Sequence, residues 1–177
     1  MAALMVAAEG GALGLFTSIQ RLRATWPDLN QRLAEADIPL YAQHIDRMNL
    51  QTLLQLFRED RRSALIGTDA VRDGVDVPGD ALRMIIYERV PWPRPDMLFR
   101  ARSAWQGRDA WTDRITRMKL RQAFGRLIRR ADDKGVFVML DSRMPTRLAT
   151  AFPKDVEIVR CGLAEVIAET KVFLSEV

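Results

Sequence analysis

Apolar residues along this chain of 177 residues fall into short continuous runs that alternate with longer stretches of helical spacing. Continuous apolar runs of about four to eight residues predict strands that are buried on both faces. Such runs lie at residues 12–18, 38–43, 62–68, 82–90, 135–141 and 156–160. Amphipathic helices are predicted at residues 19–37, 50–60, 95–105 and 110–130, near 144–152, and from Leu163 onward. This alternation predicts an α/β fold in which helices cover both faces of a mostly parallel sheet.

Proline and glycine interrupt the pattern at three places. Pro27 should kink or divide the helix predicted at residues 19–37. Residues 69–80 are rich in Asp and Gly, which predicts a long polar loop, and the prolines of residues 91–95 exclude regular strand pairing. We find no internal repeat and no second domain, so residues 1–177 are predicted to form a single domain.

Composition and charge narrow the class of protein. An apolar fraction of 48% is ample for a packed core, and the net charge of +4 is modest. The segment from Gly107 to Arg130 nevertheless carries eight Lys or Arg residues against two Asp residues, which indicates a local anion-binding surface. Cys161 is the only cysteine, which excludes internal disulfides and four-cysteine metal sites and favours the cytoplasm. Glu9 and two glycines interrupt the apolar N-terminal segment, so we expect neither export nor membrane insertion.

The basic segment raises the first functional question. At about 100° per residue, Gln122, Arg126 and Arg129 share one helical stripe, and Leu120 and Leu127 lie nearly opposite. Guanidinium groups on a rigid element suit phosphate, because their donors match its oxygens in pairs. A solvated basic helix face is the more common explanation of such a run. The segment alone leaves both interpretations open.

Polar residues that directly follow predicted strands are the other candidates, because ligands bind at the carboxyl ends of parallel strands. Thr17 and Ser18 follow the first strand and could hold a phosphate, although Ser18 could equally be a helix N-cap. The acidic stretch after the third strand could accept ribose hydroxyls, orient arginines, or be a solvated turn. Its polar members are Thr68, Asp69, Asp73 and Asp76.

Several kinds of chemistry lack their motifs in this sequence. No G-x-x-x-x-G-K-[ST] phosphate loop occurs, so any ATP must be held mainly by another domain. His44 is the lone histidine, and no catalytic triad can be assembled. Trp92 and Trp105 could stack on nucleobases or could be packing wedges.

Three segments together resemble the second motor domain of the DinG/XPD group of superfamily 2 DNA helicases. They are LFTS at residues 15–18, the stretch from GTDAVRDGVDVPGD to PWPRPD at residues 67–96, and QAFGRLIRR at residues 122–130. The resemblance extends over residues 10–160. It implies a RecA-like fold that acts as one half of an ATP-driven clamp, with the nucleotide bound between two such domains.

The resemblance also implies roles for residues on the ATP side. Gln122, Arg126 and Arg129 match a set whose arginines reach across the cleft to the nucleotide phosphates. Asp76 matches an acid expected near the ribose or these arginines, and Asp73 takes the place of a family glutamate. This sequence departs from the family at Val71, Arg72 and Asp73, where Phe-Trp-Glu is common; an aromatic contact is lost and the carboxylate is one methylene shorter.

On the other side, the family contacts the backbone of single-stranded DNA. Thr17, Ser18, Gly67 and Thr68 match positions that hold this backbone, and Gln43 stands where a further contact is common. In the family, the phosphate loop, the acidic Mg²⁺ motif and a four-cysteine iron–sulfur domain belong to the first motor half. We therefore expect ATP and Mg²⁺ to be shared with a separate N-terminal motor domain, and an iron–sulfur cluster only there.

The leading hypothesis is the C-terminal motor domain of a cytoplasmic ATP-dependent DNA helicase moving 5′ to 3′, inactive when isolated. The alternative is a non-catalytic nucleic-acid-binding module with a motor-like fold. A small-molecule binding protein would explain the sheet but not the Q-x-x-x-G-R-x-x-R pattern.

Overall fold

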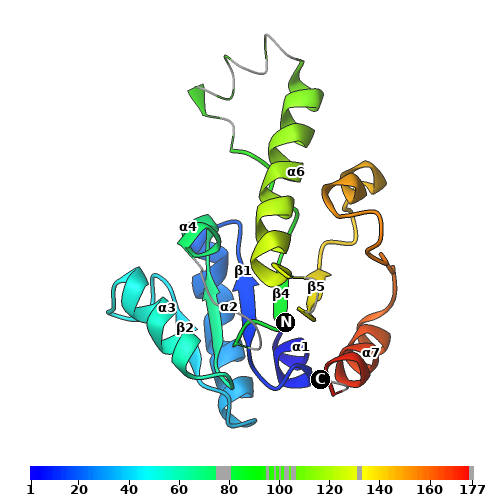
Figure 1. Ribbon diagram of the computed structural model, residues 1–177. Coiled ribbons are helices and arrows are strands. Elements are labelled where there is room, and N and C mark those ends of the chain that lie inside the picture. Colours follow the sequence, from blue (N-terminus) through cyan, green and yellow to red (C-terminus); the bar gives the residue numbers. More distant parts are fainter. Residues whose placement is uncertain are drawn as a thin grey trace.

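Five parallel strands form the centre of the molecule (Figure 1). The computed structural model describes residues 1–74, 81–94, 96, 97, 99, 101, 104, 107–130 and 133–175. The strands are β1 (Ala12–Leu15), β2 (Leu40–Ala42), β3 (Ala64–Gly67), β4 (Met84–Tyr87) and β5 (Val136–Met139). Their order in the sheet is β2-β3-β1-β4-β5, and every neighbouring pair is parallel. The predicted α/β fold with a parallel sheet is confirmed.

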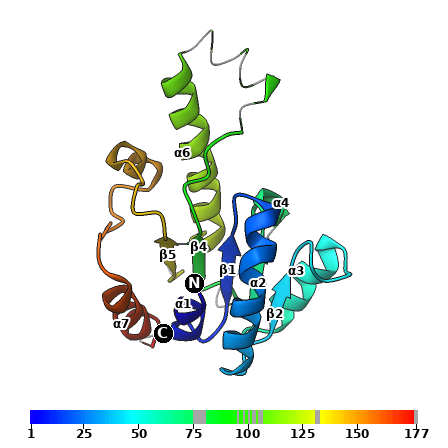
Figure 2. The same cartoon turned by 180° about the vertical axis from the view of Figure 1, so that it is seen from behind.

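Helices cover both faces of this sheet (Figures 1 and 2). One face packs against α1 (Ala2–Ala7), α2 (Ile19–Ala34) and α7 (Leu163–Ser175). The other packs against α3 (Leu50–Glu59), α4 (Asp69–Gly74), α6 (Arg108–Leu127) and the 3₁₀-helix η2 (Thr146–Ala151). Successive strand residues point to opposite faces: Leu13 faces the second group, whereas Ala12 faces the first. The predicted two-sided core is therefore confirmed.

Four local predictions need correction. Pro27 does not divide α2, because one missing hydrogen bond is outweighed by Leu22, Leu29 and Leu33, which hold both halves of the helix on the sheet. Residues 156–160 form no strand, and two of them, Ile158 and Val159, are about half exposed. The first residues of the chain form α1, for which we predicted no element.

The fourth correction concerns the predicted loop at residues 69–80, which begins with the helix α4. Thr68 accepts hydrogen bonds at its carbonyl oxygen from the N–H groups of Val71 and Arg72, which closes the first turn. Val71 is fully buried and anchors this helix on the core. Residues 75–80, including Asp76, lie outside the described residues, as does most of the helix predicted at residues 95–105.

A buried arginine joins α4 to its surroundings. The Arg72 side chain is only 6% exposed and pairs with Asp69 at 2.9 Å and with Asp73 at 2.8 Å. Asp69 also forms an ion pair with Lys119 of α6, with 2.8 Å between Oδ2 and Nζ. Burial alone would lower the pKa of Arg72, but Tyr87 and these carboxylates outweigh burial and raise it. We call Asp69, Arg72, Asp73 and Lys119 the α4–α6 ion-pair network.

The turn between α1 and β1 requires glycine. Gly10 has φ +88°, and a Cβ at this position would lie 2.2 Å from the carbonyl oxygen of Arg62. We expect Gly10→Ala to lower the free energy of unfolding by about 2 kcal/mol or more, from backbone strain and this overlap. Urea unfolding measures the loss. Gly162→Ala is the control, since nothing lies within 4 Å of its added Cβ, and it should change stability by less than about 0.5 kcal/mol. Equal losses in the two variants would contradict this prediction.

Removing both carboxylates next to Arg72 should leave its charge buried without compensation. Asp69→Asn and Asp73→Asn each retain one carboxylate, whereas the double variant retains neither. We expect the double variant to lose about 2 kcal/mol or more in urea unfolding, and more than the sum of the single losses. Asp28→Asn removes a carboxylate from an exposed pair with Arg32 and serves as control. If the loss in the double variant equalled the sum of the two single losses, Arg72 would not depend on Asp69 and Asp73 acting together.

Candidate functional site

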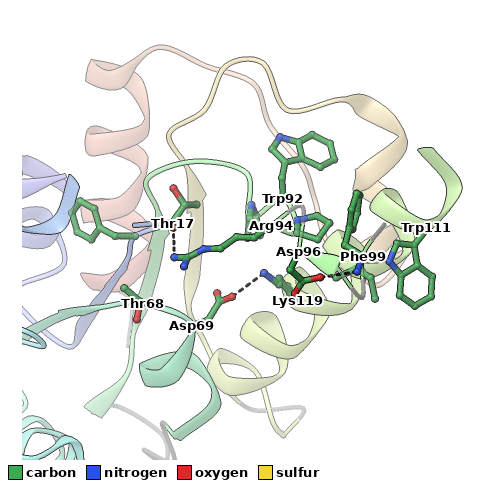
Figure 3. A pocket seen from close by; sticks show the side chains of 13 residues that line it. Thr17, Thr68, Asp69, Trp92, Arg94, Asp96, Phe99, Trp111 and Lys119 are labelled. Carbon is green, nitrogen blue, oxygen red and sulfur yellow. Dashed lines mark hydrogen bonds and ion pairs between the residues drawn. The ribbon is translucent and has the colours of Figure 1, made fainter. Parts of the chain in front are cut away.

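A crevice opens where the connections of two neighbouring strands diverge. β1 and β3 are adjacent, but α2 after β1 covers one face of the sheet and α4 after β3 covers the other. Such a switch point is the usual ligand site of an open parallel sheet. A pocket of about 520 Å³ lies there, between Thr17 after β1 and Thr68 after β3 (Figure 3). The remaining lining residues are Phe16, Asp69, Pro91, Trp92, Pro93, Arg94, Asp96, Phe99, Trp111, Ile115 and Lys119.

The structure brings three predicted residues together at the end of β3. The side-chain oxygen of Gln43 accepts the backbone N–H of Thr68 at 3.0 Å and the Thr68 hydroxyl at 3.1 Å. A Cβ on Gly67 would lie 2.1 Å from Val71 Cγ2 and 3.0 Å from Gln43 Oε1. Glycine at this position therefore lets Gln43 approach the backbone of Thr68 and hold it.

Thr17 and Ser18 lie at the end of β1, and both hydroxyls are engaged within the protein. Ser18 accepts the N–H of Arg21 at 3.2 Å, so its N-cap role is confirmed. Thr17 donates its hydroxyl to Glu88 at 3.4 Å, and its carbonyl oxygen accepts Arg94 at 3.3 Å. Arg21 also pairs with Glu88, whose side chain is 11% exposed. A carboxylate neutralised by arginine thus orients the β1 end of the crevice.

The predicted arginine set does not lie on one helix. Gln122 and Arg126 belong to α6, but that helix ends at Leu127, and the extended residue Ile128 turns Arg129 away from the stripe. Gly135, just before β5 begins, lies directly against Leu127, the last residue of α6. The prediction of a single helical stripe was therefore wrong.

A carboxylate holds the backbone that follows α6. Asp133 accepts the N–H of Arg129 at 2.7 Å and the N–H of Arg130 at 2.8 Å, and these hydrogen bonds lower the pKa of Asp133. Arg126 donates to the carbonyl oxygen of Asp73 at 3.1 Å. Gln122 and Arg129 are exposed. We call Gln122, Arg126 and Arg129 the arginine group. Asp73 of α4 holds its Arg126 side chain, and Asp133 holds the backbone of Arg129.

One short helix links the crevice to the arginine group. Asp69, at the first residue of α4, lines the pocket and pairs with Lys119. Asp73, near the end of α4, receives Arg126. Sequence reasoning did not identify Lys119 or Arg94 as site residues, although Lys119 stands in the basic segment and precedes Arg126 by seven residues, about two helical turns.

Two further features are absent from the described part of the chain, a metal-binding cluster and a membrane-spanning helix. No group of three or more His, Cys, Asp or Glu side chains among the described residues is placed to hold a metal ion. No described helix is both long and apolar enough to cross a membrane.

Two helicases are similar in sequence to this chain. The chain is 38% identical over 153 residues to the ATP-dependent helicase DinG of Mycobacterium tuberculosis, which covers 82% of this chain and 22% of that protein. It is 38% identical over 104 residues to the ATP-dependent DNA helicase YoaA of Escherichia coli, covering 54% of this chain and 16% of that protein. The chain thus spans about a fifth of the length of these relatives.

A solved structure and a family model agree with these relatives. An XPD helicase superposes on 79% of this chain and 26% of its own with a TM-score of 0.57 at 16% identity, a likeness of fold. Residues 1–158 match the model of the helicase C-terminal domain. The RecA-like interpretation of the fold is consistent with this likeness. This chain therefore belongs to the helicase C-terminal domain family, in its DinG/XPD group.

Proposed function

We propose that residues 1–177 form the C-terminal motor domain of a cytoplasmic ATP-dependent DNA helicase that moves 5′ to 3′. In this proposal the chain supplies Arg126 and Arg129 to ATP bound at an N-terminal motor domain and contacts the backbone of single-stranded DNA. The observation that carries the proposal is the α4 connection, because this short helix contacts the strand-end crevice through Asp69 and Arg126 of α6 through Asp73. Family membership and the names of the relatives support it.

The arginine group suits a polyphosphate. Arg126 is partly buried, and the partner described above is a neutral carbonyl oxygen, so this contact leaves its positive charge uncompensated. ATP, when bound, would supply the phosphoryl group that is transferred to water. Arg126 and Arg129 would stabilise the negative charge that develops on that group, and Gln122 would help to orient it. Asp73 holds Arg126 through its carbonyl oxygen, and Asp76 is assigned to the same side by resemblance. Mg²⁺ and an iron–sulfur cluster would be held by the N-terminal motor domain.

The crevice suits the backbone of a single strand. Gln43 and Gly67 fix the backbone of Thr68, and Thr17 and Ser18 form the facing strand end. Arg94 and Lys119 add cations at the same crevice, which phosphate contacts require. Since the Thr17 and Thr68 hydroxyls already donate to Glu88 and Gln43, they would contact a phosphate only by exchanging these partners.

Arginine substitutions should separate the helicase from a non-catalytic binding module. In the full-length helicase that carries this chain, Arg126→Ala and Arg129→Ala should each lower ATP turnover by about 10³-fold, with single-strand binding largely retained. Arg121→Ala, on the same helix, is the control and should keep turnover near that of the unchanged protein. The isolated chain should show no ATPase activity above background. Lost DNA binding with unchanged turnover would favour the binding module instead.

Binding of the isolated chain to single-stranded DNA should be weak and dependent on salt. Fluorescence anisotropy with a labelled oligothymidylate should show about 10-fold or greater loss of affinity between about 50 and 200 mM salt. Arg94→Ala should reduce the slope of log affinity against log salt by about 0.7, because one phosphate contact is lost. Arg32→Ala removes the same charge from α2 outside the crevice and should leave the slope unchanged. Affinity that is independent of salt would contradict a backbone interface.

A further inference from the structure

Two pockets meet at Thr17 and Trp92. Besides the crevice pocket, a second pocket of about 470 Å³ is lined by Thr17, Arg89, Val90, Trp92, Asp141 and Arg143. Thr17 and Trp92 line both pockets, so the indole of Trp92 stands at their boundary. The side chain is not a buried wedge, because Trp92 is 39% exposed. Part of the Trp92 side chain is therefore open to a ligand in either pocket.

The backbone around Trp92 is held firmly. Val90 is 2% exposed, and its N–H donates to Asp141 Oδ2 at 3.4 Å, which ties the segment to the end of β5. Pro91 is buried, and Pro93 restricts the backbone on the other side. The Trp92 N–H donates to the carbonyl oxygen of Val90 at 2.8 Å. A flat ligand that stacks on this ring therefore has little additional backbone to order.

The two pockets differ in character. The crevice pocket is rich in rings: Phe16, Phe99 and Trp111 line it together with Trp92, and Figure 3 shows Trp92, Phe99 and Trp111 on the side away from Thr17 and Thr68. Its cations Arg94 and Lys119 are balanced by Asp69 and Asp96.

The second pocket has two arginines against one carboxylate, Asp141. Arg143 is 77% exposed and only weakly paired with Asp141, at 3.4 Å. Arg89, 46% exposed, pairs with Glu88 at 3.2 Å. The part of the first pocket formed by Trp92, Phe99 and Trp111 thus suits an uncharged aromatic ring, and Arg94 beside Thr17 remains for the strand's backbone. The second pocket suits a further phosphate.

We propose that Trp92 is a base-stacking platform of the single-strand interface. An unstacked nucleobase lies on its indole in the aromatic crevice pocket, and the adjoining phosphate is held by Arg89 and Arg143 in the second pocket. This inference rests on the proposed function and extends it by naming what recognises the bases rather than the backbone. Aromatic stacking accepts every base, so the platform binds single strands without selecting a sequence.

A comparison of oligothymidylate with an abasic oligonucleotide of equal length tests the platform, because both carry the same phosphates and only one carries bases. For the isolated chain, Trp92→Ala should lower affinity for oligothymidylate by about 5-fold or more and leave affinity for the abasic strand unchanged. Trp92→Phe keeps an aromatic ring and should retain most of the difference in affinity between oligothymidylate and the abasic strand. Arg143→Ala should lower the affinity for both strands by the same factor.

Tryptophan fluorescence supplies a second measurement on folded protein. Oligothymidylate should quench the emission of the unchanged chain. Trp92→Phe should remove a large part of this quenching, the remainder coming from Trp111 in the same pocket, and Trp26→Phe, on α2, should preserve all of it. The platform would be overturned if Trp92→Ala lost the same affinity for both strands, or if Trp92→Phe left the fluorescence quenching unchanged. Either result would leave the proposed backbone interface unaffected. An unchanged chain that binds neither strand would overturn the proposed function, and the platform with it.

Discussion

The buried guanidinium of Arg72 constrains the region in which the crevice and the arginine group meet. A guanidinium group cannot lose its proton to relieve burial, so carboxylates must stay beside it. Asp69 and Asp73 provide them from the same short helix. Once they face Arg72, the second oxygen of Asp69 is directed to Lys119 and the carbonyl oxygen of Asp73 to Arg126. This charge therefore ties α4 to α6 beside the end of β3, in addition to the apolar packing of Leu120 and Leu127 on the core.

This arrangement gives the two groups a common support. The strand-end crevice lies at the start of α4, and the arginine group lies at its end. Asp69 and Asp73 stand about one helical turn apart on this helix of six residues. Chains of packed and hydrogen-bonded residues can carry energetic coupling between sites. The α4–α6 ion-pair network is contiguous across the short distance between the two groups.

The sheet could be predicted from the sequence because its strands are continuous apolar runs, and five of the six predicted strands are present. The failure at residues 156–160 has a physical cause: an apolar run is not buried unless a neighbour lies beside it, and Ile158 and Val159 stay exposed. α4 was missed because Asp and Gly are common in loops, and nothing local reveals that Arg72 is buried between two carboxylates.

In the candidate site, too, some residues could be predicted from the sequence, and others depend on contacts that the sequence does not reveal. Gln43, Gly67 and Thr68 were named from resemblance, and the structure brings them into contact across 25 residues of sequence. The placement of Arg129 was wrong because helical periodicity cannot show where a helix stops, and α6 stops at Leu127. Trp92 stayed ambiguous in sequence, since exposure decides between a wedge and a platform.

The central place of β1 has a consequence for how the chain folds during synthesis. Within this domain β1 is synthesised before both of its partners, which are β3, about 50 residues later, and β4, about 70 residues later. Until both have left the ribosome, the strand has unpaired edges, and closing such long loops is slow. The first half of the domain therefore waits with exposed apolar backbone, and arrest of synthesis before Tyr87 would leave a product prone to pair with other chains.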